Sequence, residues 1–166
     1  NALHPDLPHR TKLIAYLRGQ EIDGFRARSQ KLGDIVHSAP VFHRDIIYVG
    51  ANDAMLHAFN AGVVAAGADF GPGEEIFAYI PNLVFGNLKR LADTDYTHKY
   101  FVDLTPVVKE GRGVFGGEEV KAILVGGLGK GGRGYFALDV TEPMSMTTDK
   151  VKWEFPKADT PVIHMD

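Results

Sequence analysis

The chain has 166 residues, a formal net charge of −3 and no cysteine. Its 18 Lys and Arg residues are dispersed, which excludes the concentrated basic surface of a nucleic-acid-binding protein. Apolar runs are short, as at residues 122–125, so no membrane span is expected. The lack of cysteine excludes disulfides and thiolate metal sites but leaves the cellular compartment open, as does the absence of a visible signal peptide.

Residues 1–31 are predicted to form an extended leading segment with a short helix. The helix is expected over residues 11–19, with Thr11 as a possible N-cap and Gly19 as its stop. Residues 21–31 contain an Asp-Gly turn and are predicted to be a loop that returns toward a sheet. The helical spacing places three apolar residues on one face, namely Leu13, Ile14 and Leu17.

Two stretches of the chain repeat the same order of parts. Residues 39–61 and 105–141 each have a Pro-Val start, a β-branched strand ending in Val-Gly, a turn and an aromatic strand. Each is followed by another apolar strand, at 74–81 and 151–156. Four short strands per repeat are typical of propeller blades. We therefore predict a mainly β fold, a partial antiparallel β-propeller of about two four-stranded blades with two short helices.

The first blade is predicted over residues 32–81, with a loop inserted at 61–73. Asn52 and Asp53 are expected to supply the left-handed backbone of the hairpin turn 51–54. The run of branched residues in the second strand predicts a strand buried on both faces. The strands are expected at 32–42, 45–50, 55–60 and 74–81.

Residues 82–103 are predicted to form a helix and linker between the blades. Asn82 is the expected helix cap, and Gly86 weakens the helical pattern. The apolar residues at helical spacing are Val84, Leu88 and Leu91.

The second blade is predicted over 104–166 and is expected to be incomplete. Residues 111–119 read as a flexible hairpin loop, and 120–127 as the strand that matches 45–50. A blade has apolar faces that neighbouring blades cover, and a closed ring needs several blades. Because the sequence starts without Met and ends without a closing element, we expect a piece of a longer chain. The alternative is a small two-repeat protein that closes by oligomerising.

A glycine-rich run at 126–134 offers a nucleotide-binding pattern, since Gly127, Gly129 and Gly132 satisfy G-x-G-x-x-G. That fingerprint must open a helix, whereas the residues that follow it read as a strand. A P-loop is excluded because Lys130 is followed by glycine instead of Ser or Thr. The run is predicted to be a β-turn equivalent to residues 51–54.

Histidines and acidic residues give weak metal signals. His37, His57 and His98 lie in or beside predicted strands without a close acidic or histidine neighbour at metal-binding spacing, and His57 is predicted to be a hydrogen-bonded sheet residue. His4 and His9 belong to the leading segment. Candidate calcium ligands lack the full spacing of a calcium loop and are interpreted as solvated loop charges. They are Asp69, Glu74, Glu75, Asp93 and Asp95.

Ser38 lacks a nucleophile elbow, so catalysis by a triad is not expected. Four aspartates at predicted strand ends are interpreted as structural, since a short carboxylate there can accept backbone N–H bonds. They are Asp34, Asp53, Asp103 and Asp139. We assign no catalytic, cofactor-binding or metal-binding residue, and no cofactor, to this chain.

Several strings, in order along the chain, resemble the PilY family of type IV pilus biogenesis factors and tip-associated adhesins, in its C-terminal β-propeller domain. One departure is Ala54, where the family usually has Gly, so we expect some strain in that turn. The family's D-x-D-x-D-G calcium loop has no match in this sequence. The strings are YLRG (16–19), LGDIVHSAPVF (32–42), YVGANDAMLHAFNA (48–61), FAYIPN (77–82), YTHKYFVD (96–103) and GGRGYFALDVTEP (131–143).

The resemblance implies a non-catalytic scaffold and binding module that supports pilus biogenesis and surface attachment. It implies a place at the cell envelope, the outer membrane or the extracellular pilus tip. Its expected partners are minor pilins or the pilus tip, a host or abiotic surface and the remaining blades, with variable loops at 61–73 and 111–119 as docking points. Any calcium site is expected to lie elsewhere in the parent protein, not in this chain.

Two rival hypotheses remain open. The strand layout is also similar to that of pyrroloquinoline-quinone propeller oxidoreductases, which need polar cofactor ligands, calcium and tryptophan docking repeats, whereas Trp153 is the only tryptophan here. The other rival is a purely structural repeat protein with no role in pili.

Overall fold

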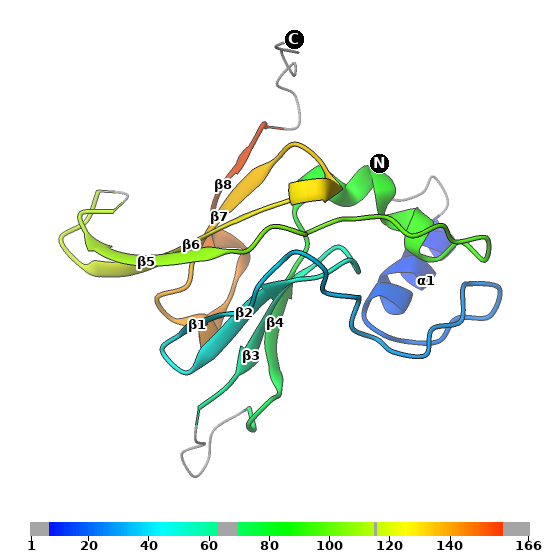
Figure 1. The fold of residues 1–166 in the computed structure, drawn as a ribbon, viewed down its shortest axis with the longest axis horizontal. Coiled ribbons are helices and arrows are strands. Elements are labelled where there is room, and N and C mark those ends of the chain that lie inside the picture. The colour runs from blue at the N-terminus through cyan, green and yellow to red at the C-terminus, as the bar shows by residue number, and fades with distance from the viewer. Residues whose placement is uncertain (1–6, 63–69, 115, 158–166) are drawn as a thin grey trace.

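The structure is a computed structural model that describes residues 7–62, 70–114 and 116–157. It contains two four-stranded antiparallel sheets, each with its strands in sequence order (Figure 1). The first sheet is β1 (Val41–His43), β2 (Ile46–Gly50), β3 (Leu56–Asn60) and β4 (Glu75–Tyr79). The second is β5 (Val107–Arg112), β6 (Val120–Gly127), β7 (Tyr135–Asp139) and β8 (Val151–Phe155). These are the two predicted blades.

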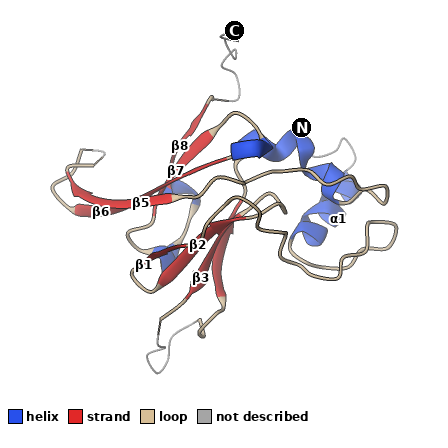
Figure 2. Cartoon of the chain, in the orientation of Figure 1, coloured by secondary structure: helices blue, strands red, loops and turns tan. Residues whose placement is uncertain are grey.

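The two sheets lie within the predicted blade ranges 32–81 and 104–166. The exact boundaries of the blades stay a prediction. The helical elements lie outside the sheets (Figure 2). They are α1 (Leu7–Leu17) and the 3-10 segments η1 (Asn82–Leu91), η2 (Gly129–Gly131), η3 (Pro143–Ser145) and η4 (Thr148–Lys150).

The first helix starts earlier than predicted. Thr11 lies inside α1 and is not its cap, and Pro8 falls in the first turn, where a missing N–H costs no hydrogen bond. Gly19 does end the helix, with a φ of 90° and its N–H donating to the Tyr16 carbonyl. Ile14, predicted on the buried face, is exposed, and Tyr16 is buried in its place.

The strand predicted over 32–42 is also wrong in extent, since only its end belongs to β1. Residues 33–40 are irregular because their polar groups bond side chains of other segments. Gly33 N donates to the Asp53 carboxylate, and Ala39 N donates to the Thr105 hydroxyl. By contrast β2 is paired on both sides and mostly buried, as predicted, whereas β6 alternates between half-buried and buried positions from Lys121 to Gly126.

The segment after the first blade is a 3-10 helix, η1, which takes up the first ten residues of the predicted helix and linker at 82–103. Asn82 is the first residue of this helix and not its cap, since Pro81 holds the N-cap position. The backbone N–H and the side-chain amide of Asn82 donate to Glu154 of the second blade. The expected apolar face is confirmed, since Val84, Leu88 and Leu91 are buried.

The turn between β2 and β3 differs from its prediction in one position. Ala54, not Asn52 or Asp53, adopts the left-handed backbone, with a φ of 81°. Both polar residues are buried and use their side chains as hydrogen-bond partners. Ala54 is therefore the position of this turn where the backbone favours glycine.

Side chains of the two blades contact each other at more than one place along the sheets. Tyr79 donates its hydroxyl to Glu154 on β8, and its ring lies 5.2 Å from that of Phe136 on β7. Burial, together with Glu154, raises the pKa of Tyr79. At the β1–β2 hairpin, Arg44 Nε lies 2.6 Å from Glu110 of β5. Both polar and apolar contacts therefore fix the blades against each other.

Candidate functional site

The linker before the second blade lies between the two hairpin turns and bonds to both. Phe101 N donates to Asn52 Oδ1 and Val102 N to the Ala51 carbonyl, which belong to the first turn. The next two N–H groups bond the second turn, since Asp103 N donates to the Leu128 carbonyl and Leu104 N to the Gly127 carbonyl. Phe101 and Val102 are fully buried, so the linker acts as a strap across one rim of the blades.

His57, on β3, is held between two carboxylates. Its Nε2 lies 3.1 Å from both carboxylate oxygens of Asp53, and its Nδ1 lies 2.5 Å from Glu75 Oε1 on β4. Burial lowers its pKa, but the two carboxylates outweigh burial and raise the pKa to about 9. Asp53 also accepts the N–H groups of Gly33 and Met55. The prediction of a hydrogen-bonded sheet histidine is confirmed.

The other two candidate histidines also have acidic partners that the sequence did not show. His37 Nδ1 lies 2.7 Å from Asp103 Oδ2, and His98 Nε2 lies 2.8 Å from Asp34 Oδ2. The sequence showed no acidic residue at metal-binding spacing from these histidines, and it could not show these partners, which are more than sixty positions away in sequence.

Asp34 and Asp139 are carboxylates whose bonding partners favour the charged form. Burial alone would raise the pKa of each carboxyl group. Hydrogen bonds from His98 and Asn52 outweigh burial at Asp34, so its pKa is lowered. Thr141 and Lys152 have the same effect on the pKa of Asp139. Asp139 accepts the N–H and hydroxyl of Thr141, which is the strand-end bonding expected of these aspartates.

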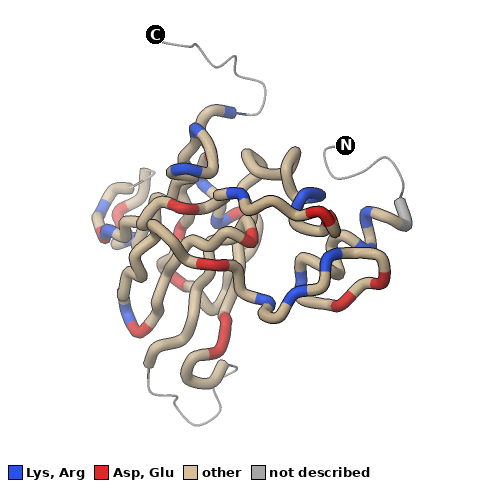
Figure 3. Tube along the Cα trace, turned by 45° about the vertical axis from the view of Figure 1, so that its right-hand side comes forward, with Lys and Arg blue, Asp and Glu red and all other residues tan. Residues whose placement is uncertain are grey.

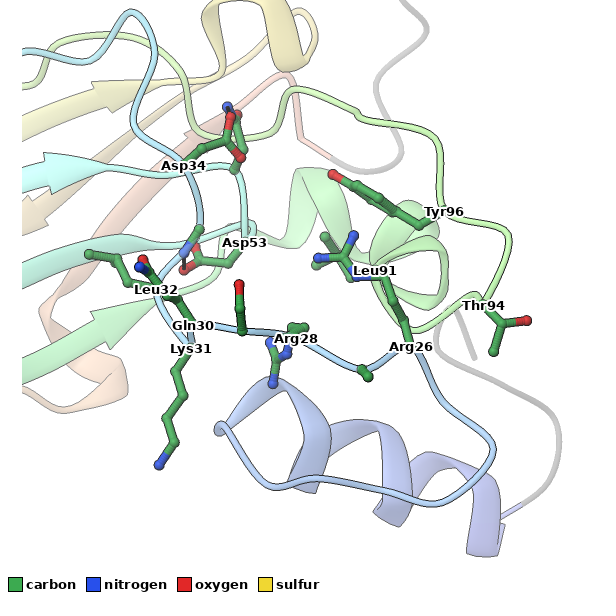
Figure 4. A pocket seen from close by; sticks show the side chains of 14 residues that line it. Arg26, Arg28, Gln30, Lys31, Leu32, Asp34, Asp53, Leu91, Thr94 and Tyr96 are labelled. Carbon is green, nitrogen blue, oxygen red and sulfur yellow. Dashed lines mark hydrogen bonds between the residues drawn. The ribbon is translucent and has the colours of Figure 1, made fainter.

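A cleft of about 520 Å³ lies between the loop that follows α1, the start of the first blade and η1 (Figure 4). Cationic side chains come from the loop, and Asp34 and Asp53 come from the blade side. The lining residues are 26–34, Asn52, Asp53, Leu91, Thr94 and Tyr96. A second cavity, of about 730 Å³, is lined by Tyr16 and residues 19–31, so the same loop borders both.

Two arginines of this loop are stacked on tyrosine rings. The guanidinium carbon of Arg26 lies 3.7 Å from the ring centre of Tyr96, and that of Arg28 lies 3.8 Å from the ring centre of Tyr16. Arg28 Nη2 also donates to the Tyr16 carbonyl at 2.5 Å. Sequence reasoning described residues 21–31 only as a loop and missed this site. The alternation Arg-x-Arg was the one available signal.

Other candidates from the sequence form no site. The glycine-rich run makes the turn η2, and β7 follows it instead of a helix, so the turn interpretation is confirmed. Ser38 is buried and accepts the Gly50 N–H. Within residues 7–62, 70–114 and 116–157, no group of three His, Asp or Glu side chains is placed to hold a metal ion.

The acidic residues considered for calcium are not brought together. Glu75 is hydrogen-bonded to His57, and Glu74 Oε2 accepts the Gly71 N–H. Asp93 and Asp95 are exposed beyond η1. Asp69, His4 and most of the predicted loop 61–73 lie outside the described residues. Elsewhere acidic and basic residues are interspersed along the trace (Figure 3).

The profile of the PilY1 beta-propeller domain matches residues 29–159. The chain belongs to this family. It is 38% identical over 175 residues to the type IV pilus biogenesis factor PilY1 of Pseudomonas aeruginosa, a match that covers 86% of this chain and 14% of that protein. It is 34% identical over 185 residues to a PilY1 homolog of Xylella fastidiosa, covering 86% and 12% respectively.

A solved structure is also similar to this chain. The crystal structure of the Pseudomonas aeruginosa PilY1 C-terminal domain matches with 38% identity and a TM-score of 0.43, over 66% of this chain and 18% of that one. The chain spans about one seventh of the length of its PilY1 relatives, since it covers 14% of the first. These relatives are named as biogenesis factors and not as enzymes.

Every described helix is too short or too polar to cross a bilayer.

Proposed function

We propose that this chain is a non-catalytic scaffold and binding module of a protein that supports type IV pilus biogenesis and surface attachment. The observation that carries the proposal is the family match over residues 29–159, together with relatives that are named type IV pilus biogenesis factors. The proposed place of action is the cell envelope, the outer membrane or the pilus tip. The proposed partners are minor pilins or the pilus tip, a host or abiotic surface and further blades of the parent protein.

The packing of the two blades supports a role in which rigid sheets present loops and clefts to partners. Phe101 and Val102, in the strap between the two turns, are buried. Glu154 of the second blade accepts hydrogen bonds from Tyr79 and Asn82. Rigid elements hold a binding surface in one geometry and so reduce the conformational entropy that binding would otherwise cost. We propose that this chain holds no cofactor and that any calcium requirement arises elsewhere in the parent protein.

The proposal is tested in a strain that lacks the gene. We expect fewer surface pili and weaker attachment, both restored by the full wild-type protein and less fully by a protein with Glu154→Ala and Tyr79→Ala, which lacks one of the contacts between the blades. The pilus count tests biogenesis, and attachment per piliated cell tests adhesion. Unchanged piliation and attachment after deletion would contradict the proposal. Quinone absorbance with calcium-dependent dye reduction by the purified protein would favour the oxidoreductase alternative.

A further inference from the structure

The cleft beside the first blade carries positive charge that forms no ion pair among the described residues. Within residues 7–62, 70–114 and 116–157, Arg26, Arg28 and Lys31 form no ion pair. The two acidic residues that line the same cleft are already engaged. Asp53 is bonded to His57 and two backbone N–H groups, and Asp34 is bonded to His98 and Asn52.

Stacking fixes the orientation of both guanidinium groups. Arg26 lies over Tyr96 and Arg28 over Tyr16, and the bond from Arg28 to the Tyr16 carbonyl restricts it further. A guanidinium stacked on a ring keeps its N–H donors in its own plane, so its free edge can still bind a planar carboxylate with two hydrogen bonds. Because these side chains are already ordered, a ligand that binds them loses less conformational entropy.

The spacing of the two arginines fits an extended chain. They are separated by one residue in a segment without helix or strand, so their Cα atoms are at most about 7 Å apart. Alternate residues of an extended peptide lie on one side, also about 7 Å apart. Acidic residues at positions i and i+2 of such a peptide are therefore compatible with the backbone spacing of Arg26 and Arg28, while the tyrosine on which each guanidinium stacks sets where the guanidinium lies.

We propose that this cleft binds an acidic peptide segment of a partner protein in extended form. Two of its carboxylates pair with Arg26 and Arg28, and Lys31, at the exposed end of the loop, adds a third positive charge. A peptide fits better than a uniformly anionic polymer because Asp34 lies half exposed at the edge of the same cleft and would repel dense negative charge. The volume of about 520 Å³ is typical of ligand-binding clefts. This inference concerns the chemistry of the cleft and does not depend on the pilus role.

The test measures binding of a fluorescent peptide, Ser-Glu-Ser-Glu-Ser, to the full protein by anisotropy. The control peptide has Gln at both Glu positions. Two charge-matched variants are compared: Arg26→Gln with Lys31→Gln in the cleft, and Lys89→Gln with Arg90→Gln on the exposed side of η1. Thermal melts check that each variant is folded. If the cleft variant fails to fold, Lys31→Gln alone and the charge-preserving Arg26→Lys replace it.

We expect the acidic peptide to bind about 10-fold more tightly than the Gln peptide, with an affinity that falls as salt rises. The cleft variant should lose most of that difference, and the η1 variant should keep it. Arg26→Lys should weaken binding although the charge is kept, because the two-bond geometry is lost. Equal binding of the two peptides, or equal loss in the two double variants, would overturn the proposal. Tighter binding of heparin than of the acidic peptide would overturn the choice of a peptide ligand.

Discussion

Asp103, in the strap before the second blade, bonds His37 at the start of the first blade, although 66 positions separate them. Its Oδ2 lies 2.7 Å from His37 Nδ1, and its Oδ1 accepts the His37 backbone N–H at 3.2 Å. The Asp103 side chain is 1% exposed. One buried carboxylate therefore joins the irregular segment that leads into β1 to the strap that leads into β5.

Replacing Asp103 with Ala should lower the free energy of unfolding by about 1–3 kcal/mol, because it leaves the His37 backbone N–H without its acceptor. The measurement is chemical denaturation of the full protein. Asp95→Ala, an exposed acidic residue beyond η1, is the control and should change stability by less than about 0.5 kcal/mol. Equal effects of the two substitutions would show that the bond contributes nothing.

Ala54→Gly should be neutral or stabilising, by up to about 1 kcal/mol, although glycine normally destabilises a folded protein. Ala54 is fully buried with a φ of 81°, so glycine relieves backbone strain that offsets the lost methyl group. The matched control is Ala58→Gly, since Ala58 is equally buried in β3 but has extended backbone. That substitution should cost about 1–2 kcal/mol. Similar losses at both positions in thermal melts would contradict the strain.

Because of His57, the free energy of unfolding should fall as the pH rises into the alkaline range. Its pKa is raised to about 9 in the folded protein, above the ordinary value near 6.5, so the folded state binds the proton more tightly. The resulting stabilisation is complete below about pH 6.5 and is lost as the pH rises through about 9, with a total of order 1–3 kcal/mol.

Unfolding free energies at pH 6 and pH 9.5 test this expectation. His57→Gln should remove most of the difference between the two pH values. His98→Gln, at a histidine with a 44% exposed side chain, should retain it. If His57→Gln keeps the full pH dependence, other groups are responsible for it.

Tyr48→Phe should stabilise the protein by about 1 kcal/mol, because the Tyr48 hydroxyl is buried without a hydrogen-bond partner among the described residues. Burial also raises the pKa of this tyrosine to about 12. The same change at Tyr79 should instead destabilise by about 1–2 kcal/mol, since its hydroxyl bonds Glu154. Denaturation of both variants checks the opposite signs, and a loss at Tyr48 would mean that its hydroxyl has a partner.

Sequence periodicity predicted the two sheets, the buried strand β2 and the glycine-rich turn η2 because these depend on neighbouring residues. Strand alternation and turn preferences act over a few positions and can be read from the chain. The same applies to Gly19 as a helix stop and to the buried face of η1. Strain at Ala54 was expected from the family resemblance and not from the local pattern, and the φ of 81° agrees with it.

The polar contacts and the cleft were decided by tertiary structure. His37 meets Asp103, and Tyr79 meets Glu154, only because two sheets pack together, and no local pattern encodes a partner 66 or 75 positions away. The short β1 has the same origin, because the residues before it satisfy their backbone groups with side chains of distant segments. Arg26 and Arg28 read as ordinary loop charges until Tyr96 and Tyr16 are placed beneath them. Preferences of neighbouring residues therefore determined the helices, strands and turns, whereas packing between distant segments determined the polar contacts and the cleft.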